Sequence, residues 1–357
     1  MYKVIIINDF DLTSSIGKTF KDYEKAISDY GKFYSLAYSW KYKSYPGKAV
    51  YPDFTSKLVG RHIFSELPYD VGNYVNSRLS VISFHAFREK ILKERTDEII
   101  HYSNYRISPF TNDEKSVITM NDLIYSKTGR FREALIKSYL LRNLKSYMKF
   151  RYVQSVSNVV KRELEDYGFE GQIKTLYQPV PEYFRKLSLD KKTLRKGLGL
   201  PLDKTLLLSV STNRPGKNLR ALKEMMQLMD ERYHLVRVGT PIGTSTTFTN
   251  VPDEMLNKIY NACDVLIIPS TEEGFGRPIT EAFTVGIPVV ASDIEVFREV
   301  ADNAALLVEP KPQNLKKAVE ETVETSSNFI SLGMKRSSFF SFRTFSVELK
   351  KFYESIY

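Results

Sequence analysis

Apolar and polar positions alternate regularly in the second half of the chain. Short runs rich in Val, Ile and Leu have the length of strands, and longer amphipathic stretches between them have the period of helices. The predicted strands are 205–211, 234–239, 265–269, 288–291 and 305–308. The clearest predicted helices are 219–232, Asp253–Ala262 and 315–324. Alternation of this kind predicts a doubly wound parallel sheet.

The first half alternates less regularly, but its pattern predicts the same class of fold. The candidate strands are 4–7, 81–84, 98–101, Ser116–Met120 and 153–155. Between them lie helix-like segments, the longest of which runs from Arg130 to Arg151. We therefore predict an α/β protein with two Rossmann-like domains, one over 1–185 and one over 186–337.

The join between these domains is expected in the region 178–200. Pro179 and Pro181 disfavour regular structure at its start, and a lysine-rich stretch follows. The last segment, about 338–357, is aromatic and amphipathic, and we expect a helix that packs back on the first domain. Two such domains on a hinge place ligands in the cleft between them, at the carboxyl ends of strands.

Composition narrows the possible partners and compartments. The 357 residues carry a formal net charge of +10, with a pI near 9.3, which favours anionic partners: nucleotide phosphates, a membrane surface or nucleic acid. Compositional bias is the alternative explanation, and the charge alone does not separate these. Cys263 is the only cysteine, so no intrachain disulfide forms, as suits a reducing compartment. No apolar run reaches the length of a membrane span, and the first residues resemble a strand rather than a signal peptide. We expect a cytoplasmic protein.

The segment 273–281 carries the most specific chemistry. Glu273 and Glu281 stand eight residues apart across a Gly-Phe-Gly turn, after the buried strand 265–269. Pro278 suits the first turn of a helix, so the segment is expected to run from strand through glycine turn to helix. A helix N-terminus attracts anions, and carboxylates accept hydrogen bonds from sugar hydroxyls. The combination suits a nucleotide-sugar.

A second loop between a predicted strand and a predicted helix carries two cations. Arg214 and Lys217 lie in Ser-Val-Ser-Thr-Asn-Arg-Pro-Gly-Lys-Asn, residues 209–218. A guanidinium and an ammonium group there could neutralise a departing diphosphate. Taken alone, the loop is more simply explained as a solvated basic surface. The neighbouring motif at 273–281 favours the phosphate interpretation.

These residues together carry a family resemblance. The sequence Pro-Ser-Thr-Glu-Glu-Gly-Phe-Gly-Arg-Pro-Ile-Thr-Glu-Ala (269–282), followed by Gly-Ile-Pro-Val-Val-Ala-Ser (286–292), resembles the signature of retaining family-4 glycosyltransferases. Arg214 and Lys217-Asn218 resemble the phosphate loop of that family. The resemblance is strong over roughly 150–325 and weak over 1–115. It implies the GT-B fold, in which two Rossmann-like domains face a central cleft.

The resemblance also implies a role for each residue. Glu281 would hold the ribose hydroxyls of the donor, and Glu273 the hydroxyls of its sugar. The backbone N–H groups of Gly274, Phe275 and Gly276 would approach the sugar and the phosphates. Arg214 and Lys217 would stabilise the leaving diphosphate without a metal ion. The alternative for the two glutamates is helix capping beside a solvated loop.

Candidates in the first half are weaker. Asn121 and Asp122 stand where the family has His-Asp, and Asn121 cannot transfer a proton near neutral pH. Asp122 is equally well explained by a turn at a strand end. Gly17 ends the expected loop 9–17 before a helix near Lys18, in a region where the family has glycines facing phosphate. His101 ends a candidate strand and could touch the sugar, but a structural histidine is the simpler explanation.

Other classes of site receive less support. The four histidines have no metal-ligand spacing, so we expect no metal, and no glycine fingerprint supports a dinucleotide cofactor. The segment from Arg130 to Arg151 has seven basic residues and one acid at near-helical apolar spacing. A domain helix explains it slightly better than a helix on an anionic membrane surface. Sequence signatures of nucleic-acid binding are absent, so nucleic acid is not an expected partner.

The sequence therefore predicts a retaining glycosyltransferase that moves a sugar from a nucleoside-diphosphate sugar to an acceptor hydroxyl by front-face attack. The acceptor stays open among a glycan, a lipid-linked glycan and a protein. A glycosidase is disfavoured because the two acids do not flank one scissile bond. Two alternatives remain: another GT-B enzyme of nucleotide-sugars, such as an epimerase, and a catalytically silent nucleotide-sugar-binding protein. The second is motivated by Asn121 and by the scarcity of glycines in the first loop.

Overall fold

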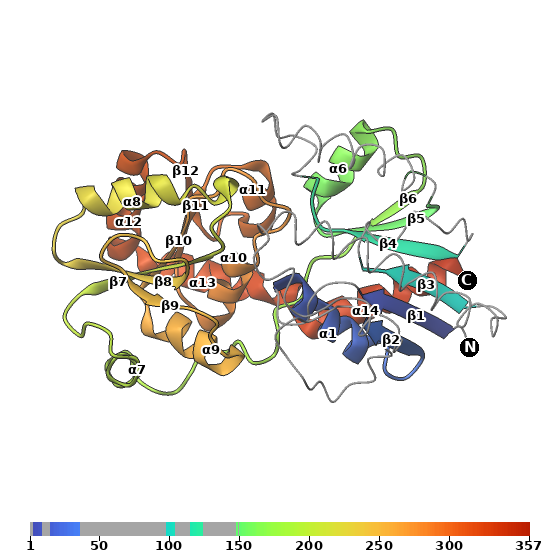
Figure 1. Cartoon of the computed structure of the whole chain (residues 1–357), viewed down its shortest axis with the longest axis horizontal. Helices are drawn as coiled ribbons and strands as arrows, with labels where there is room; N and C mark the ends of the chain where they lie inside the picture. The colour runs from blue at the N-terminus through green and yellow to red at the C-terminus, as the bar shows by residue number, and fades with distance from the viewer. Residues whose placement is uncertain (1–2, 9–14, 36–97, 104–114, 124–147, 149) are drawn as a thin grey trace, which may run out of the picture. The chain divides into compact units, whose positions relative to one another are not determined.

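A computed structural model describes residues 3–8, 15–35, 98–103, 115–123, 148 and 150–357 of the chain. The chain divides into two compact units. The first contains residues 1–156, 160–176 and 346–357, and the second contains 157–159 and 177–345. Each unit is built on a six-stranded sheet whose pairings are all parallel (Figure 1). Two Rossmann-like α/β units are thus present, as the sequence predicted.

The first unit orders its strands β2-β1-β3-β4-β5-β6. The elements that the structure describes are β1 (Lys3–Asn8), α1 (Ser15–Ala26), β2 (Gly31–Ser35), β3 (Glu98–Tyr102), β4 (Ser116–Met120), β5 (Tyr152–Ser155), α6 (Asn158–Asp166), β6 (Gln172–Thr175) and the end of α14 (Phe342–Ile356). The central strands are buried along nearly their whole length, because apolar residues cover both faces of a parallel sheet.

A buried polar network crosses the middle of this unit. One ring nitrogen of His101 on β3 is hydrogen-bonded to the hydroxyl of Tyr353 at 2.6 Å, and the other to Thr119 Oγ1 at 2.7 Å. Gln154 on β5 continues the network to the hydroxyl of Tyr23 on α1. Polar groups in a core need such partners, because an unpaired one would lose its hydration without compensation. The network therefore joins three strands to α1 and to the last helix of the chain.

The second unit orders its strands β12-β11-β10-β7-β8-β9. Its elements are α7 (Lys191–Leu198), β7 (Thr205–Ser211), η2 (Pro215–Lys217), α8 (Leu219–Leu228), β8 (Tyr233–Gly239), β9 (Thr246–Phe248), α9 (Asp253–Ala262), β10 (Val265–Ile268), α10 (Arg277–Val285), β11 (Val289–Ser292), α11 (Glu295–Ala301), β12 (Leu306–Val308), α12 (Pro312–Glu324), α13 (Ser326–Ser337) and η3 (Ser338–Phe340). From β7 the chain adds β8 and β9 on one side of that strand, and it then crosses to the other side, where β10, β11 and β12 follow. The topological switch point lies between β7 and β10, which is where such sheets bind ligands.

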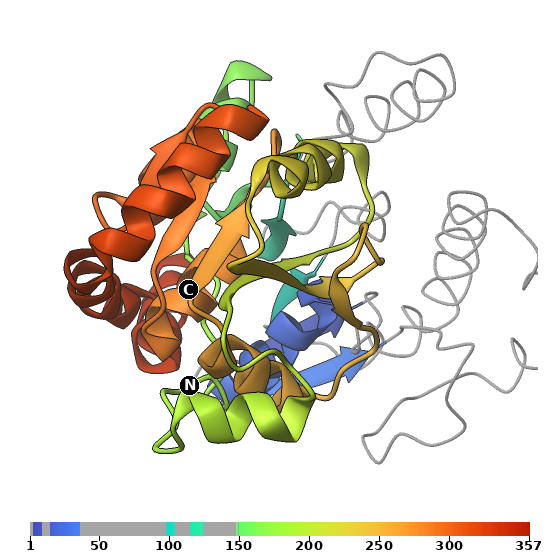
Figure 2. The same ribbon diagram turned by 90° about the vertical axis from the view of Figure 1, so that its left-hand side faces the viewer.

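Helices cover both faces of the second sheet (Figure 1). Leu207 and Leu235 on the sheet pack with Leu222 and Met225 of α8 and with Val319 of α12 in one buried cluster. The helices α9 and α10 lie on the opposite side (Figure 1). The two views also place α7 and α8 on opposite sides of this sheet (Figure 2). The core is therefore a three-layer sandwich with the strand ends free to carry loops.

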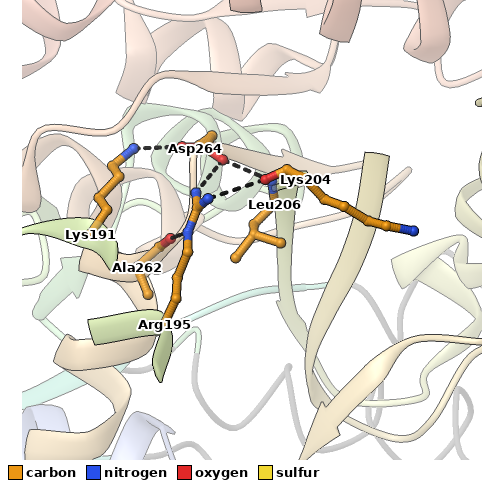
Figure 3. A network of polar contacts seen from close by, with 6 residues as sticks. All are labelled: Lys191, Arg195, Lys204, Leu206, Ala262 and Asp264. Carbon is orange, nitrogen blue, oxygen red and sulfur yellow. Dashed lines mark hydrogen bonds and ion pairs between the residues drawn. The ribbon is translucent and has the colours of Figure 1, made fainter. Parts of the chain in front are cut away.

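An ion-pair network closes the amino-terminal edge of this sheet (Figure 3). Asp264, at the start of β10, accepts hydrogen bonds from Arg195 at 2.5 Å and from Lys191 at 2.7 Å, both on α7. The same carboxylate accepts the backbone N–H of Leu206 on β7 at 2.8 Å. Arg195 also donates to the carbonyl of Ala262 at 2.9 Å. This network fastens α7 to two strand starts, at the edge opposite the switch-point loops.

Most elements expected in the second half are confirmed, including β7 and α9 at their predicted bounds. Residues 178–181 are irregular, as the prolines required. The helix α7 lies in the region expected to contain the hinge. Asp190 caps its start through Thr193 N, and Gly199 ends it at φ +65°. Of the predicted first-half elements, the strand 81–84 lies outside the described residues, as does most of the segment from Arg130 to Arg151.

Candidate functional site

Two loops meet at the switch point of the second unit. One leads from β7 through η2 to α8, and the other leads from β10 to α10. The backbone N–H of Thr271 in the second loop donates to the carbonyl of Gly216 in the first at 2.8 Å. A Cβ on Gly216 would lie 3.3 Å from a carboxylate oxygen of Glu272. The small residue at 216 thus lets the two loops pack directly on each other.

Lys217 and Glu273 form an ion pair between these loops. Their side chains are 20% and 14% exposed, so the pair is shielded but reachable from solvent. Glu273 also accepts a hydrogen bond from Ser270 Oγ at 3.1 Å. Arg214 lies three residues before Lys217 and is exposed, and its carbonyl accepts the N–H of Lys217 at 3.0 Å. The structure therefore brings together Lys217 and Glu273, with Arg214 in the same loop.

The segment after β10 runs from strand through glycine turn to helix, as the sequence predicted. Gly276 is the N-cap of α10 at φ +98°, a conformation that residues with a Cβ rarely adopt. A Cβ at this position would also lie 2.7 Å from the ring of Phe297. Phe275 is buried, and its ring stacks on Tyr177 with centroids 5.9 Å apart. The turn is thus held in one conformation by packing on both sides.

Ser157 supports the same turn from a distant part of the sequence. This serine is fully buried, and its hydroxyl donates to the carbonyl of Gly274 at 2.9 Å. In a planar trans peptide the carbonyl and the following N–H point in opposite directions. A carbonyl of Gly274 that is directed to Ser157 therefore directs the N–H of Phe275 away from that serine.

Glu281 is the fifth residue of α10 and is only 6% exposed. One carboxylate oxygen accepts the hydroxyl of Tyr260 at 2.7 Å, and the other lies 3.7 Å from a guanidinium nitrogen of Arg277. Burial, together with the neighbouring Glu281, raises the pKa of Tyr260 well above its ordinary value, so the phenol remains a donor. Both carboxylate oxygens of Glu281 thus have a partner within α9 and α10, and these contacts help to orient the carboxylate.

The other predicted candidates lie in the first unit. Asn121 and Asp122 directly follow β4 and are half-buried. His101 is fully buried with both ring nitrogens hydrogen-bonded, so we treat it as structural. Gly17 is the third residue of α1, which begins at Ser15, so the expectation that Gly17 ends the preceding loop is wrong.

Sequence reasoning missed three residues that shape this site. Arg277 could have been found, since it precedes Glu281 by four positions on a predicted helix, a spacing that brings side chains together. For Tyr260 the sequence indicated only a position on a predicted helix. For Ser157 it contained no feature that indicated a role in the site. Their contacts with Glu281 and Gly274 depend on the tertiary fold. In the described ranges we find no group of His, Cys, Asp and Glu side chains that could hold a metal ion, and no helix suited to crossing a membrane.

Comparison with solved structures defines the class of protein. A sucrose-phosphate synthase from Thermosynechococcus elongatus superposes with a TM-score of 0.78 at 15% identity, over 100% of this chain and 99% of that one. HepE from Anabaena, solved with UDP-glucose, gives 0.71 at 16% identity, over 99% and 100%. The glycosyltransferase WaaG gives 0.66 at 14%, over 95% of both chains. At these identities the likeness establishes the fold, which is GT-B, as expected from the sequence.

Comparison at the sequence level finds relatives of the second unit. Residues 190–329 match the family described as "Glycosyl transferases group 1". O-antigen chain mannosyltransferase B of Escherichia coli is 34% identical over 123 residues, which span 29% of this chain and 32% of the relative. O-antigen chain mannosyltransferase RfbU of Salmonella typhimurium is 29% identical over 140 residues, 35% and 40% of the two lengths. The resemblance to GT-B glycosyltransferases that the motifs suggested is thereby confirmed.

Proposed function

We propose that the chain transfers a hexosyl residue, with mannosyl as the first candidate, from a nucleoside-diphosphate sugar to a hydroxyl of a growing glycan. The observation that carries this proposal is the pairing of Lys217 with Glu273 at the switch point, beside the capped glycine turn and the buried Glu281. The mannosyl and glycan assignments are supported by the names of the partial relatives, and the diphosphate-sugar assignment by the ligand named for HepE.

Each residue of this arrangement has a chemical task in the proposal. Glu281, oriented by Tyr260 and Arg277, accepts hydrogen bonds from ribose hydroxyls. Glu273 accepts them from the donor sugar. Lys217 turns from Glu273 to the diphosphate when the donor binds, and there it stabilises the charge that develops as the glycosidic bond breaks. Arg214 adds charge from the exposed part of the loop. Preorganised cations of this kind stabilise a leaving group at the moment when its charge develops.

The finer features predicted from the sequence belong to the same proposal. We propose retention of configuration by front-face attack, without a metal ion, and an acceptor side formed by the first domain with Asn121 and Asp122 as candidates. The proposed domain borders are 1–185 and 186–337. Cytoplasmic location and a peripheral contact with an anionic membrane through the segment from Arg130 to Arg151 are proposals too, and most of that segment lies outside the described residues.

The test begins with donor binding. The melting temperature of the purified chain is measured with UDP, GDP, ADP, UDP-glucose, GDP-mannose and ADP-glucose. A ligand that binds only the native state at 100 times its Kd adds about 2.7 kcal/mol, so an increase of several degrees is expected for at least one of them. No increase with any of the six would refute the donor assignment.

Variants then locate the site, and turnover separates the remaining alternatives. Lys217→Ala is expected to abolish the thermal shift, whereas Lys223→Ala, which removes an exposed lysine from α8, is expected to keep it. Release of the nucleoside diphosphate is then followed with mannosylated glycans as acceptors. A wild-type chain that binds donor but never releases diphosphate would favour the silent binding protein. Interconversion of free sugar nucleotides would favour the epimerase.

A further inference from the structure

Arg237 is a buried cation that the site described above does not use. It lies on β8 with 0% of its surface exposed. Its guanidinium makes five hydrogen bonds, all to neutral oxygens of residues at or beyond the strand ends. The acceptors are Ser209 O at 3.0 Å, Ser209 Oγ at 3.2 Å, Ser211 O at 2.6 Å, Ser211 Oγ at 3.0 Å and Thr240 O at 3.2 Å.

Among the residues that the structure describes, no acid neutralises the charge of Arg237. None of the carboxylates in the described part of the chain pairs with this guanidinium. Burial lowers the pKa of Arg237 to about 10, which still leaves it cationic at neutral pH. A buried charge without a partner is costly, and fully hydrogen-bonded neutral acceptors compensate only in part. An anion that binds nearby would recover part of this cost.

The position of Arg237 indicates which anion that is. Register partners share a face, so Arg237 lies on the same face as Ser209 and Ser211 and follows Leu235 on it. That face is the one on which α8 packs, through Leu222 and its neighbours. The chain that leaves β7 must therefore turn onto this face to reach α8. Arg237 lies at the carboxyl end of the face, at the base of the loop that carries Arg214 and Lys217.

The strand ends are also packed closely at this point. Gly239 has φ +133°, and a Cβ on it would lie 2.2 Å from the carbonyl oxygen of Ser211. The same carbonyl accepts the shortest hydrogen bond of Arg237. The residue that begins the cation-bearing loop is thus held directly by the guanidinium. The helix α8 that follows the loop has no acidic residue in its first turn, so its N-terminal dipole adds to the positive potential.

We propose that Arg237 is a positioning residue for the diphosphate of the donor. Its hydrogen bonds fix the end of β7, from which the loop of Arg214 and Lys217 continues. Its positive charge strengthens diphosphate binding through the electrostatic potential, without contact between the guanidinium and the phosphates. This inference rests on the proposed function. In this proposal the diphosphate of the donor is the anion that offsets the buried charge of Arg237. Removal of the arginine charge is therefore predicted to weaken binding of the nucleoside diphosphate more than binding of the nucleoside.

The test compares Arg237→Gln with a matched control at the other end of the same strand. Arg232 precedes β8 by one residue, about 16 Å from Arg237 along the strand, and its exposed side chain pairs with Asp230. Arg232→Gln therefore removes the same charge at the opposite edge of the sheet. Titration calorimetry gives Kd for UDP and uridine, or for GDP and guanosine, whichever pair the wild type binds.

In Arg237→Gln the diphosphate is expected to bind about tenfold or more weakly relative to its nucleoside, because one charge near a multiply charged anion is lost in a partly buried site. Arg232→Gln is expected to keep the wild-type ratio. An equal loss for diphosphate and nucleoside, or no loss, would overturn the proposal. A wild type that binds no diphosphate would instead refute the proposed function on which it rests.

A second variant covers the case in which Arg237→Gln does not fold. Arg237→Lys keeps the charge but loses the planar fork that holds Ser209 and Ser211. Because the positive charge is kept, the ratio of its affinity for the diphosphate to its affinity for the nucleoside is expected to stay within about threefold of the wild-type ratio. A tenfold fall in that ratio despite the retained charge would contradict the electrostatic part of the proposal.

Discussion

Lys217 and Glu273 pair across two loops that lie 56 residues apart in the sequence. The cation that we propose for the diphosphate is thus paired with the acid that we propose for the sugar. Under the proposed function, this pair opens when a donor binds. Donor binding and turnover therefore depend on the two residues in different ways.

Replacement of Glu273 by Gln separates these effects. The variant releases Lys217 from its partner, so we expect the nucleoside diphosphate to bind as tightly as in wild type or up to about tenfold tighter. Transfer of the sugar is expected to fall by about 10²-fold, because the neutral amide is a weaker acceptor for sugar hydroxyls than the carboxylate and replaces one of its oxygens by a donor. Calorimetry with the diphosphate and a steady-state transfer assay measure the two quantities. The neighbouring Glu272→Gln serves as control, and a parallel loss of both quantities in Glu273→Gln would contradict the assignment.

Gly276→Ala tests the geometry of the turn. The substitution places a Cβ at φ +98° and 2.7 Å from the ring of Phe297, so we expect a loss of about 2–4 kcal/mol in the free energy of unfolding. Gly243→Ala is the control, since its φ is +53° and nothing lies within 4 Å of the new Cβ. Its cost should stay near 1 kcal/mol. Urea unfolding measures the free energy of unfolding of both variants. An equal loss in the two would show that the contact with Phe297 adds nothing to the cost of the substitution.

Ser157→Ala removes the hydroxyl that holds the carbonyl of Gly274. We expect about 1–2 kcal/mol lower stability and a fall of about tenfold in kcat with a smaller change in KM, because the turn loses its fixed orientation. Ser157→Thr keeps the hydroxyl and should recover most of kcat. If Thr and Ala lower kcat equally while both chains remain folded, the hydrogen bond does not position the turn.

His101 gives the first unit a dependence on pH. Burial lowers its pKa from 6.5 to about 3, so the folded chain holds this imidazole neutral while the unfolded chain protonates it below pH 6.5. The unfolded state then binds more protons, and stability falls as pH drops from about 6.5 toward 3, by up to about 1.4 kcal/mol per pH unit.

This dependence is measured by urea unfolding at pH 7, 6 and 5. His101→Gln keeps hydrogen-bonding capacity for Tyr353 and Thr119 but cannot titrate. We expect the variant to be less stable at pH 7 and to have a shallower pH slope than wild type. Identical slopes in the two proteins would assign the acid sensitivity to other groups.

Asp264→Asn tests the network at the amino-terminal edge of the second sheet. Asp264 pairs with Arg195, which is buried, and with Lys191, and it accepts the N–H of Leu206. Loss of the charge leaves a buried guanidinium without its partner, and we expect about 2–4 kcal/mol of destabilisation. Asp293→Asn removes an exposed pair with Arg298 and should cost less than about 1 kcal/mol. Donor affinity should be unchanged in Asp264→Asn, since Asp264 lies at the opposite edge from the switch-point loops.

The part of the fold that the sequence predicted is the part with regular hydrophobic periodicity. Val265–Ile268 and Asp253–Ala262 were readable because a buried parallel strand is continuously apolar and an amphipathic helix repeats every 3.6 residues. The short strands Gly31–Ser35 and Thr246–Phe248 were missed. Neither contains a continuous run of Val, Ile or Leu, and pairing with a neighbouring strand defines each of them.

The candidate site divides in the same way. Glu273, Glu281 and Lys217 were identified because they lie in compact motifs whose spacing has a chemical meaning. Arg237 and Ser157 were not, because an arginine inside an apolar strand and a serine before a helix have many structural explanations. Apart from Thr240, the partners of Arg237 lie 26 and 28 residues away in the sequence. The partner of Ser157 lies 117 residues away. Such contacts follow from the fold and cannot be read from local sequence.

The bond between His101 and Tyr353 spans 252 residues and has a consequence for synthesis of the chain. Residues 346–357 complete the first unit, so its core cannot close until they have left the ribosome. The second unit is encoded before them and can fold while the protein is still being made. Loss of residues 346–357 would therefore damage the unit whose strands β1 to β6 are all synthesised before the second sheet.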